Sequence, residues 1–262
     1  MTDTDAWAAG EKYEPYVGRW SRLVAAGFLD WLDLPAGLRW LDVGCGTGAL
    51  TAGVLERAAP DRMLGVDPSA AFLRYAASQV PHATFVAGDA QALPVADGAV
   101  DALVSGLALN FVPDRLRALT EMRRVARPGG TVALYVWDYQ GGMQLMQHFW
   151  DAAVELDPAT ADRQEALRFD FCRPDPLRAL FADAGLIGVE VDGVVVPTVF
   201  ADFDDYWTPF LGGTGPAPSY AMSLPEENRA ALREALRTRL PTGADGTIRL
   251  TARAWAIRGT DS

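Results

Sequence analysis

Short apolar runs alternate with segments of helical periodicity between residues 38 and 137. The runs predict five strands at Arg39–Val43, Arg62–Val66, Ala83–Val86, Val100–Ser105 and Thr131–Trp137. Between them, apolar residues recur every three or four positions, which predicts the helices Thr47–Ala58, Ser69–Gln79 and Asp114–Val125. Strands that alternate with helices are typical of a parallel sheet covered on both faces, so the expected class is α/β.

Beyond Trp137 the pattern becomes mostly helical. In residues 138–171 one apolar helical face is formed by Met143, Met146, Phe149, Trp150 and Val154. This face predicts a helical insertion that packs over the open edge of the sheet. Further elements are expected at Asp175–Ala184, Ile187–Val196, Phe203–Phe210, Pro225–Leu240 and Thr247–Arg258. The run 212–218 is rich in glycine and proline and predicts a flexible or turning loop, either a linker or a lid.

The first strand leads into a glycine turn with glycines at 44, 46 and 48. A side chain at Gly44 or Gly46 would keep the backbone away from a ligand that lies across the turn. The acidic Asp42 stands at the end of the strand, facing the same crevice. The spacing Gly44-x-Gly46-x-x-Ala49 also satisfies the dinucleotide-binding fingerprint. The turn alone therefore does not identify which nucleotide-like ligand binds.

Two more acidic residues follow predicted strands. Asp67 lies 19 residues past Gly48, where a carboxylate accepts hydrogen bonds from a ribose diol or, alternatively, only caps the next helix. Asp89, in Gly88-Asp-Ala90, is placed to accept a hydrogen bond from an exocyclic amine such as that of adenine. The carboxyl ends of three strands therefore carry acids that converge on one crevice.

Composition excludes several classes of function. The formal net charge of −11 over 262 residues and the lack of a long basic run disfavour a nucleic-acid substrate. Lys12 is the only lysine, so a phosphate-binding Gly-Lys-Thr loop is absent. The two cysteines, Cys45 and Cys172, form neither a disulfide framework nor a zinc pair, and we expect no metal. No apolar run approaches the length of a membrane span, which predicts a soluble, cytoplasmic protein.

Five motifs occur in order at the spacing of βα units: Leu41-Asp-Val-Gly-Cys-Gly-Thr-Gly48, Gly65-Val-Asp-Pro-Ser69, Gly88-Asp-Ala90, Asp101-Ala-Leu-Val-Ser105 and Arg127-Pro-Gly-Gly130. On these motifs residues 38–137 resemble the class I S-adenosylmethionine-dependent methyltransferases, particularly the bacterial group similar to ubiquinone/menaquinone C-methyltransferases. The resemblance is weaker and general elsewhere. It implies a Rossmann-like, doubly wound, seven-stranded and mostly parallel sheet with an antiparallel last strand and helical cap insertions.

The resemblance also implies which residues bind S-adenosylmethionine (SAM) and its product S-adenosylhomocysteine (SAH). Gly44 and Gly46 let the backbone approach the methionine part, Asp67 holds the ribose, and Asp89 meets the adenine. The other residues expected at the cofactor are Asp42, Pro68, Ser69, Ala90, Ser105, Tyr16 and Arg19. Arg19 is expected either to pair with the cofactor carboxylate or to form a surface ion pair while Tyr16 and Trp20 pack.

We expect one methyltransferase domain over residues 1–262. It begins with an N-terminal helical cover (1–37), followed by the cofactor-binding core (38–137) and a helical insertion (138–173). The C-terminal part (174–262) completes the sheet and carries a second cap segment (200–241).

The expected activity is transfer of a methyl group from SAM to an oxygen, nitrogen or carbon atom of a small molecule, by in-line displacement in a capped pocket. No catalytic residue is assigned, because a lone histidine on a helix such as His148, the obvious candidate base, is more often packed or exposed than catalytic. Aromatic residues of the cap either line an acceptor pocket or form core: Tyr139, Trp150, Phe171, Tyr206, Trp207 and Phe210.

Three alternatives stay open on the sequence. A non-catalytic module that binds SAM or SAH uses the same cofactor residues. A NAD(P)-dependent oxidoreductase shares the glycine turn, but Lys12, the lone lysine, leaves no Tyr-x-x-x-Lys pair. A nucleic-acid methyltransferase is disfavoured by the acidic charge and by the lack of an Asn-Pro-Pro-Tyr or Pro-Cys segment after a strand.

Overall fold

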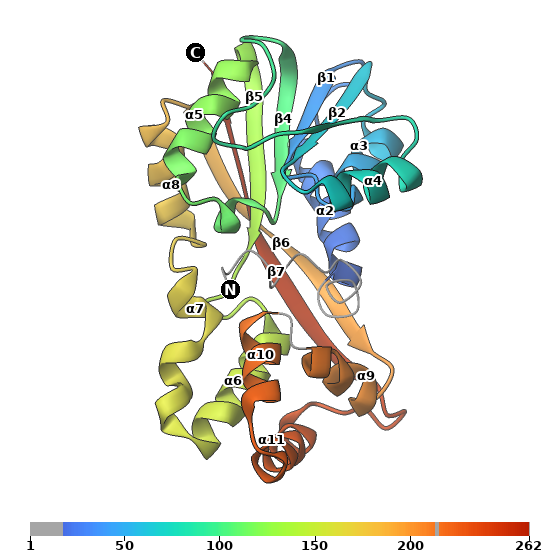
Figure 1. The fold of residues 1–262 in the computed structure, drawn as a ribbon, viewed down its shortest axis with the longest axis vertical. Helices are drawn as coiled ribbons and strands as arrows, with labels where there is room; N and C mark the ends of the chain where they lie inside the picture. Colours follow the sequence, from blue (N-terminus) through green and yellow to red (C-terminus); the bar gives the residue numbers. More distant parts are fainter. Residues whose placement is uncertain (1–17, 213–214, 262) are drawn as a thin grey trace. The chain divides into compact units, whose positions relative to one another are not determined.

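The computed structural model describes residues 18–212 and 215–261 (Figure 1). These residues divide into two compact units. The first, here the sheet unit, contains residues 21–136, 171–194 and 254–261. The second, here the helical unit, contains residues 18–20, 137–170, 195–212 and 215–253.

Seven strands form one sheet in the order β3-β2-β1-β4-β5-β7-β6, with β7 antiparallel. The strands are β1 (Arg39–Val43), β2 (Arg62–Asp67), β3 (Thr84–Ala87), β4 (Val100–Gly106), β5 (Ala126–Trp137), β6 (Ile187–Phe200) and β7 (Ile248–Thr260). This architecture confirms the predicted Rossmann-like α/β class, including the antiparallel last strand.

The strands β1 to β4 are parallel to their neighbours, and their register aligns the carboxyl ends. Asp42 of β1 lies opposite Gly65 of β2 and Val104 of β4, and Asp67 lies opposite Ala87 of β3. The chain order reverses between β1 and β4, and in open α/β sheets a ligand binds outside the carboxyl ends of the strands at this reversal. The sheet therefore places the predicted acids at the edge where a ligand is expected.

The helices of the sheet unit are α2 (Arg19–Leu32, which begins in the helical unit), α3 (Ala49–Arg57), α4 (Ala70–Gln79), α5 (Arg115–Val125) and α8 (Pro174–Asp183), with the short η3 (Leu109–Phe111). The hydroxyl oxygen of Ser69 caps α4 by accepting a hydrogen bond from the amide of Phe72 at 3.3 Å. Helices α5 and α8 lie side by side (Figure 1).

The helical unit contains α6 (Gln144–Leu156), η4 (Pro158–Arg163), α7 (Glu165–Arg168), α9 (Phe203–Trp207), η5 (Thr208–Gly212), α10 (Pro216–Ser223) and α11 (Glu226–Arg239). Its core is aromatic: the rings of Phe149 and Phe210 stack with centroids 4.5 Å apart. The hydroxyl of the buried Tyr206 donates to the carbonyl of Leu145 at 2.9 Å. None of the described helices is long and apolar enough to cross a membrane.

Among the boundaries that differ from the sequence prediction, two have a clear physical reason. Strand β5 begins at Ala126, not Thr131, because the Arg-Pro-Gly-Gly segment pairs with the end of the chain: Gly129 donates to the carbonyl of Asp261, whose own amide donates to Gly130. The predicted loop at 212–218 is wrong from Pro216 onward, where α10 starts. Proline at the first helical position after a glycine suits a helix start, since that amide needs no partner.

Candidate functional site

The glycine turn connects β1 to α3 in a left-handed backbone that favours glycine. Gly44 has φ +72° and donates from its amide to the carbonyl of Val66 at 2.7 Å. A Cβ on Gly44 would lie 2.5 Å from the Cβ of Ala108, so this position is closed by packing. A Cβ on Gly46, at φ +52°, would meet nothing within 4 Å. The turn is therefore open to a ligand at Gly46 and closed at Gly44.

Asp67, the last residue of β2, ties the turn to the start of α4. Its Oδ2 accepts a hydrogen bond from the amide of Gly46 at 2.9 Å, and its Oδ1 accepts one from the amide of Ser69 at 2.8 Å. Burial raises the pKa of Asp67, while these two hydrogen bonds act in the opposite direction. Each carboxylate oxygen keeps a further lone pair, so the group still has capacity to accept hydroxyl donors.

Asp42 is the more deeply buried acid, with 1% of its surface exposed. The hydroxyl of Thr51 in α3 donates to its Oδ2 at 2.7 Å, whereas its buried Oδ1 has no hydrogen-bond partner among the described residues. Burial raises the pKa of Asp42 to about 7, and the nearby charge of Asp67 adds to the effect. The side chain is therefore turned toward α3, and its protonation changes near neutral pH.

The remaining predicted residues of the sheet unit lie along the same edge. Asp89 stands two residues beyond β3, is exposed, and accepts a hydrogen bond from the amide of Gln91 at 2.8 Å. Ser105 is buried near the end of β4. Pro68 is exposed and Ala90 is half-buried. The fold thus brings nine of the eleven expected cofactor residues to one edge of the sheet, and their contacts with a cofactor stay a prediction.

Arg19 belongs to the helical unit and forms an ion pair there. Its Nη1 donates to Oδ1 of Asp205 at 2.8 Å, and its guanidinium carbon lies 4.5 Å from the ring of Trp20 and 4.8 Å from that of Phe200. This is the ion-pair alternative raised by the sequence, and a contact with the cofactor carboxylate stays a prediction. Tyr16 lies outside the described residues.

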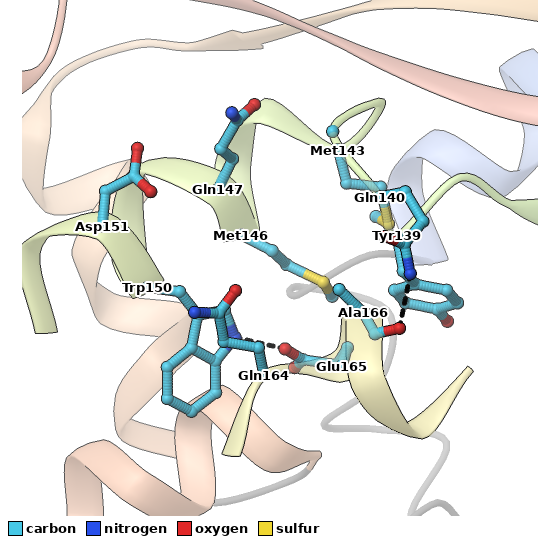
Figure 2. A pocket seen from close by; sticks show the side chains of 11 residues that line it. Tyr139, Gln140, Met143, Met146, Gln147, Trp150, Asp151, Gln164, Glu165 and Ala166 are labelled. Atoms are coloured by element: carbon cyan, nitrogen blue, oxygen red, sulfur yellow. Dashed lines mark hydrogen bonds between the residues drawn. The ribbon is translucent and has the colours of Figure 1, made fainter. Parts of the chain in front are cut away.

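The helical unit holds a cavity of about 190 Å³ (Figure 2). It is lined by Tyr139, Gln140, Gly141, Met143, Met146, Gln147, Trp150, Asp151, Gln164, Glu165 and Ala166. Sequence reasoning singled out Trp150 and Tyr139 but missed Glu165, which is only 3% exposed. A glutamate in a short helix normally faces water, so its burial carried no signal in the sequence.

Other chemistry-bearing side chains are less suited to catalysis. His148 lies on α6 outside the cavity lining, and its pKa is lowered mainly by burial, with Asp151 raising it and Arg239 lowering it further. Cys45 and Cys172 are buried thiols, and burial raises the pKa of Cys45. Tyr206, Trp207 and Phe210 are buried. These three aromatic residues therefore form part of the core, which is one of the two roles that the sequence left open for them.

Comparison with known proteins gives similarities in sequence and in fold. Residues 41–134 match the family described as "Methyltransferase domain". An uncharacterized methyltransferase of Mycobacterium tuberculosis (strain H37Rv) is 38% identical over 110 residues, which cover 42% of this chain and 44% of that protein. The chain thus matches less than half the length of that relative.

A demethylmenaquinone methyltransferase of Anoxybacillus flavithermus is 31% identical over 180 residues, which cover 61% of this chain and 74% of that protein. Among solved structures, the YcgJ protein of Bacillus subtilis aligns with a TM-score of 0.58 at 18% identity. That alignment covers 91% of this chain and 98% of the YcgJ chain, and it shows the shared fold.

Proposed function

Because the chain belongs to the class I S-adenosylmethionine-dependent methyltransferases, we propose that it transfers the methyl group of SAM to a small-molecule acceptor and releases SAH. The observation that carries the proposal is the carboxylate of Asp67, which binds the amide of Gly46 at the open part of the glycine turn. An acid held at this place suits a ribose diol. The demethylmenaquinone relative, by its name, methylates a small molecule.

The residues at the carboxyl edge of the sheet fit the cofactor. A ligand has room against the backbone at Gly46, where even a Cβ would touch nothing within 4 Å. Asp67 retains lone pairs for the ribose hydroxyls, and the exposed Asp89, whose oxygens accept hydrogen bonds from Gln91, retains a lone pair for an adenine amine. When bound, SAM supplies a methyl group on a positively charged sulfur, which an electron-rich atom displaces.

The work of the protein in such a reaction is orientation. Methyl transfer by in-line displacement needs the acceptor atom aligned behind the methyl carbon, and a water-poor site favours it without a side-chain catalyst. We assign no catalytic base. His148 is half-buried with a lowered pKa, which keeps it neutral near pH 7 and able to accept a proton, and its participation is tested below.

The activity is tested by incubating the protein with SAM and separate panels of phenols, amines, carboxylic acids and quinols, with SAH formation as the readout. Asp67→Asn is the site variant. Asp61→Asn is its matched control, because Asp61 is an exposed acid just before the amino end of the same strand. We expect SAH formation with one panel, lost in Asp67→Asn and retained in Asp61→Asn. His148→Gln with unchanged turnover would exclude the histidine as a base.

The same experiment separates the alternative of a non-catalytic module. Such a protein binds SAM and SAH tightly but forms no SAH with any panel. The proposed activity would then be wrong although the assignment of Asp67 survives. Turnover of an RNA or DNA substrate in place of the small molecules would contradict the proposed acceptor class.

A further inference from the structure

The cavity of the helical unit is formed by three short stretches of chain. Helix α6 contributes Met146, Gln147, Trp150 and Asp151, the segment before it contributes residues 139–141 and 143, and α7 with its preceding residue contributes 164–166. Figure 2 shows the carboxylate of Glu165 directed at the indole nitrogen of Trp150, with the thioether of Met146 beside it. Both polar and polarizable groups therefore face the same space.

Glu165 is a buried carboxylate that accepts hydrogen bonds from neutral donors only. The indole Nε1 of Trp150 donates to its Oε2, and the amide of Ala217 donates to its Oε1 at 3.2 Å. Among the described residues it forms no ion pair. Because both oxygens already accept from N–H groups, the surroundings are arranged for a negative charge, while burial makes that charge costly without a cation nearby.

Among the described residues, no cation near the cavity forms an ion pair with Glu165. Arg239 Nη2 donates to Oε2 of Glu155 at 2.5 Å, and its Nη1 lies 3.8 Å from Oδ2 of Asp151, too far for a hydrogen bond. Burial raises the pKa of Glu165, and the charge of Arg168, which acts to lower this pKa, has the smallest influence on it. Within the described residues Glu165 thus has no ion pair, whereas the exposed Asp151, which lines the same cavity, has an ion pair with Arg239 at 3.8 Å.

The rest of the lining suits a positively charged nitrogen. Trp150 and Tyr139 present aromatic rings, and Met143 and Met146 present polarizable sulfur, all of which interact favourably with a cation. A purely apolar ligand would leave the buried carboxylate without a counter-charge. The cavity of about 190 Å³ limits the occupant to a small molecule or to one end of a larger one.

Arg253, a residue of β7 in the same unit, forms hydrogen bonds that hold one wall of the cavity in place. Arg253 donates from Nε and Nη2 to Oδ2 of the buried Asp138 at 2.8 and 2.5 Å. Asp138 in turn accepts from the amide of Gln140 at 3.0 Å, and the carbonyl of Gly142 accepts from the amide of Arg253 at 2.8 Å. The segment that carries Tyr139 and Gln140 is therefore fixed before a ligand arrives, which lowers the ordering cost of binding.

We propose that this cavity binds the protonated amine of a small organic molecule, with Glu165 and Asp151 supplying the negative charge. The inference goes beyond the proposed function, because the lining of this cavity defines the amine site and the reaction does not.

The test compares a protonated amine with its neutral isostere, benzylamine against benzyl alcohol, at pH 7.5 on the full chain. Binding is followed by NMR titration of the Trp150 indole N–H, assigned with Trp150→Phe. Asp151→Asn removes one charge, and its matched control is Glu155→Gln, which lies on the same helix, also contacts Arg239 and does not line the cavity. Glu165→Gln is the second variant, with its fold checked by circular dichroism.

We expect benzylamine to bind at least tenfold more tightly than benzyl alcohol, with the ratio falling threefold or more in Asp151→Asn and unchanged in Glu155→Gln. Equal affinity for benzylamine and benzyl alcohol would overturn the proposal. An affinity ratio that is the same in the parent, in Asp151→Asn and in a folded Glu165→Gln would overturn it as well. These titrations contain no SAM, so a failure here leaves the methyltransferase proposal intact. Conversely, if the protein binds amines but forms no SAH, only the methyltransferase proposal is refuted.

Discussion

Replacing Asp42 with asparagine removes a buried group whose charge opposes folding at neutral and alkaline pH. Its ordinary pKa of 3.8 applies in the unfolded chain, whereas burial raises the pKa of Asp42 to about 7 in the folded protein. Between these two values the folded state binds the proton more tightly than the unfolded state. Stability therefore decreases as pH rises from about 4 to about 7.

The size of this decrease follows from the two pKa values. Each pH unit between them corresponds to about 1.4 kcal/mol, so the full loss is about 4 kcal/mol. The amide oxygen of an asparagine still accepts the hydrogen bond from Thr51, while its NH₂ stands where Oδ1 has no partner and costs about 1–3 kcal/mol at every pH. The variant is therefore close to the parent in stability near pH 5 and about 1–3 kcal/mol more stable than the parent above pH 7.

The measurement is urea unfolding followed by circular dichroism at pH 5, 6, 7 and 8. We expect the difference in unfolding free energy between Asp42→Asn and the parent to change in favour of the variant from pH 5 to about pH 7 and to level off by pH 8. Asp61→Asn serves as the exposed control, with a difference that stays constant. A constant difference for Asp42→Asn as well would refute the buried, high-pKa assignment of this acid.

Three further substitutions test the glycine turn and the start of α4. Gly44→Ala places a Cβ 2.5 Å from that of Ala108 at a positive φ, and we expect a loss of about 2–4 kcal/mol in urea unfolding; an unchanged midpoint would contradict the packing argument. Gly46→Ala meets open space but puts an alanine at a positive φ, so we expect about 1–2 kcal/mol of destabilisation and weakened SAM binding by calorimetry; unaltered affinity would place the cofactor elsewhere. Ser69→Ala removes the cap on Phe72 and costs about 1 kcal/mol in thermal unfolding, whereas no shift in Tm would show the cap to be dispensable.

The sequence predicted the sheet unit well because its signals are local. The strand Arg39–Val43 is found with the predicted bounds, and β2 extends only one residue further, to Asp67. Each of these strands is a short apolar run followed by a turn or a cap, so neighbouring residues suffice to define it. The alignment of the acids at one edge then follows from parallel pairing alone.

What the sequence did not predict depends on distant residues. Strand β5 gains its first residues by pairing with Asp261 at the other end of the chain. Glu165 is buried because Trp150 and Ala217, 15 and 52 residues away, supply its hydrogen-bond donors. No window of neighbouring residues contains such partners, so the cavity and its charge emerge only from the folded chain.

The central claim is that the carboxyl edge of the sheet binds SAM through Asp67. It is tested most directly by calorimetric titration of the protein with SAM and SAH, with NAD as the control ligand and with Asp67→Asn and Asp61→Asn in parallel. The account predicts micromolar binding of both sulfur compounds, lost in Asp67→Asn and kept in Asp61→Asn. Binding of NAD alone, or SAM binding that Asp67→Asn leaves intact, would contradict it.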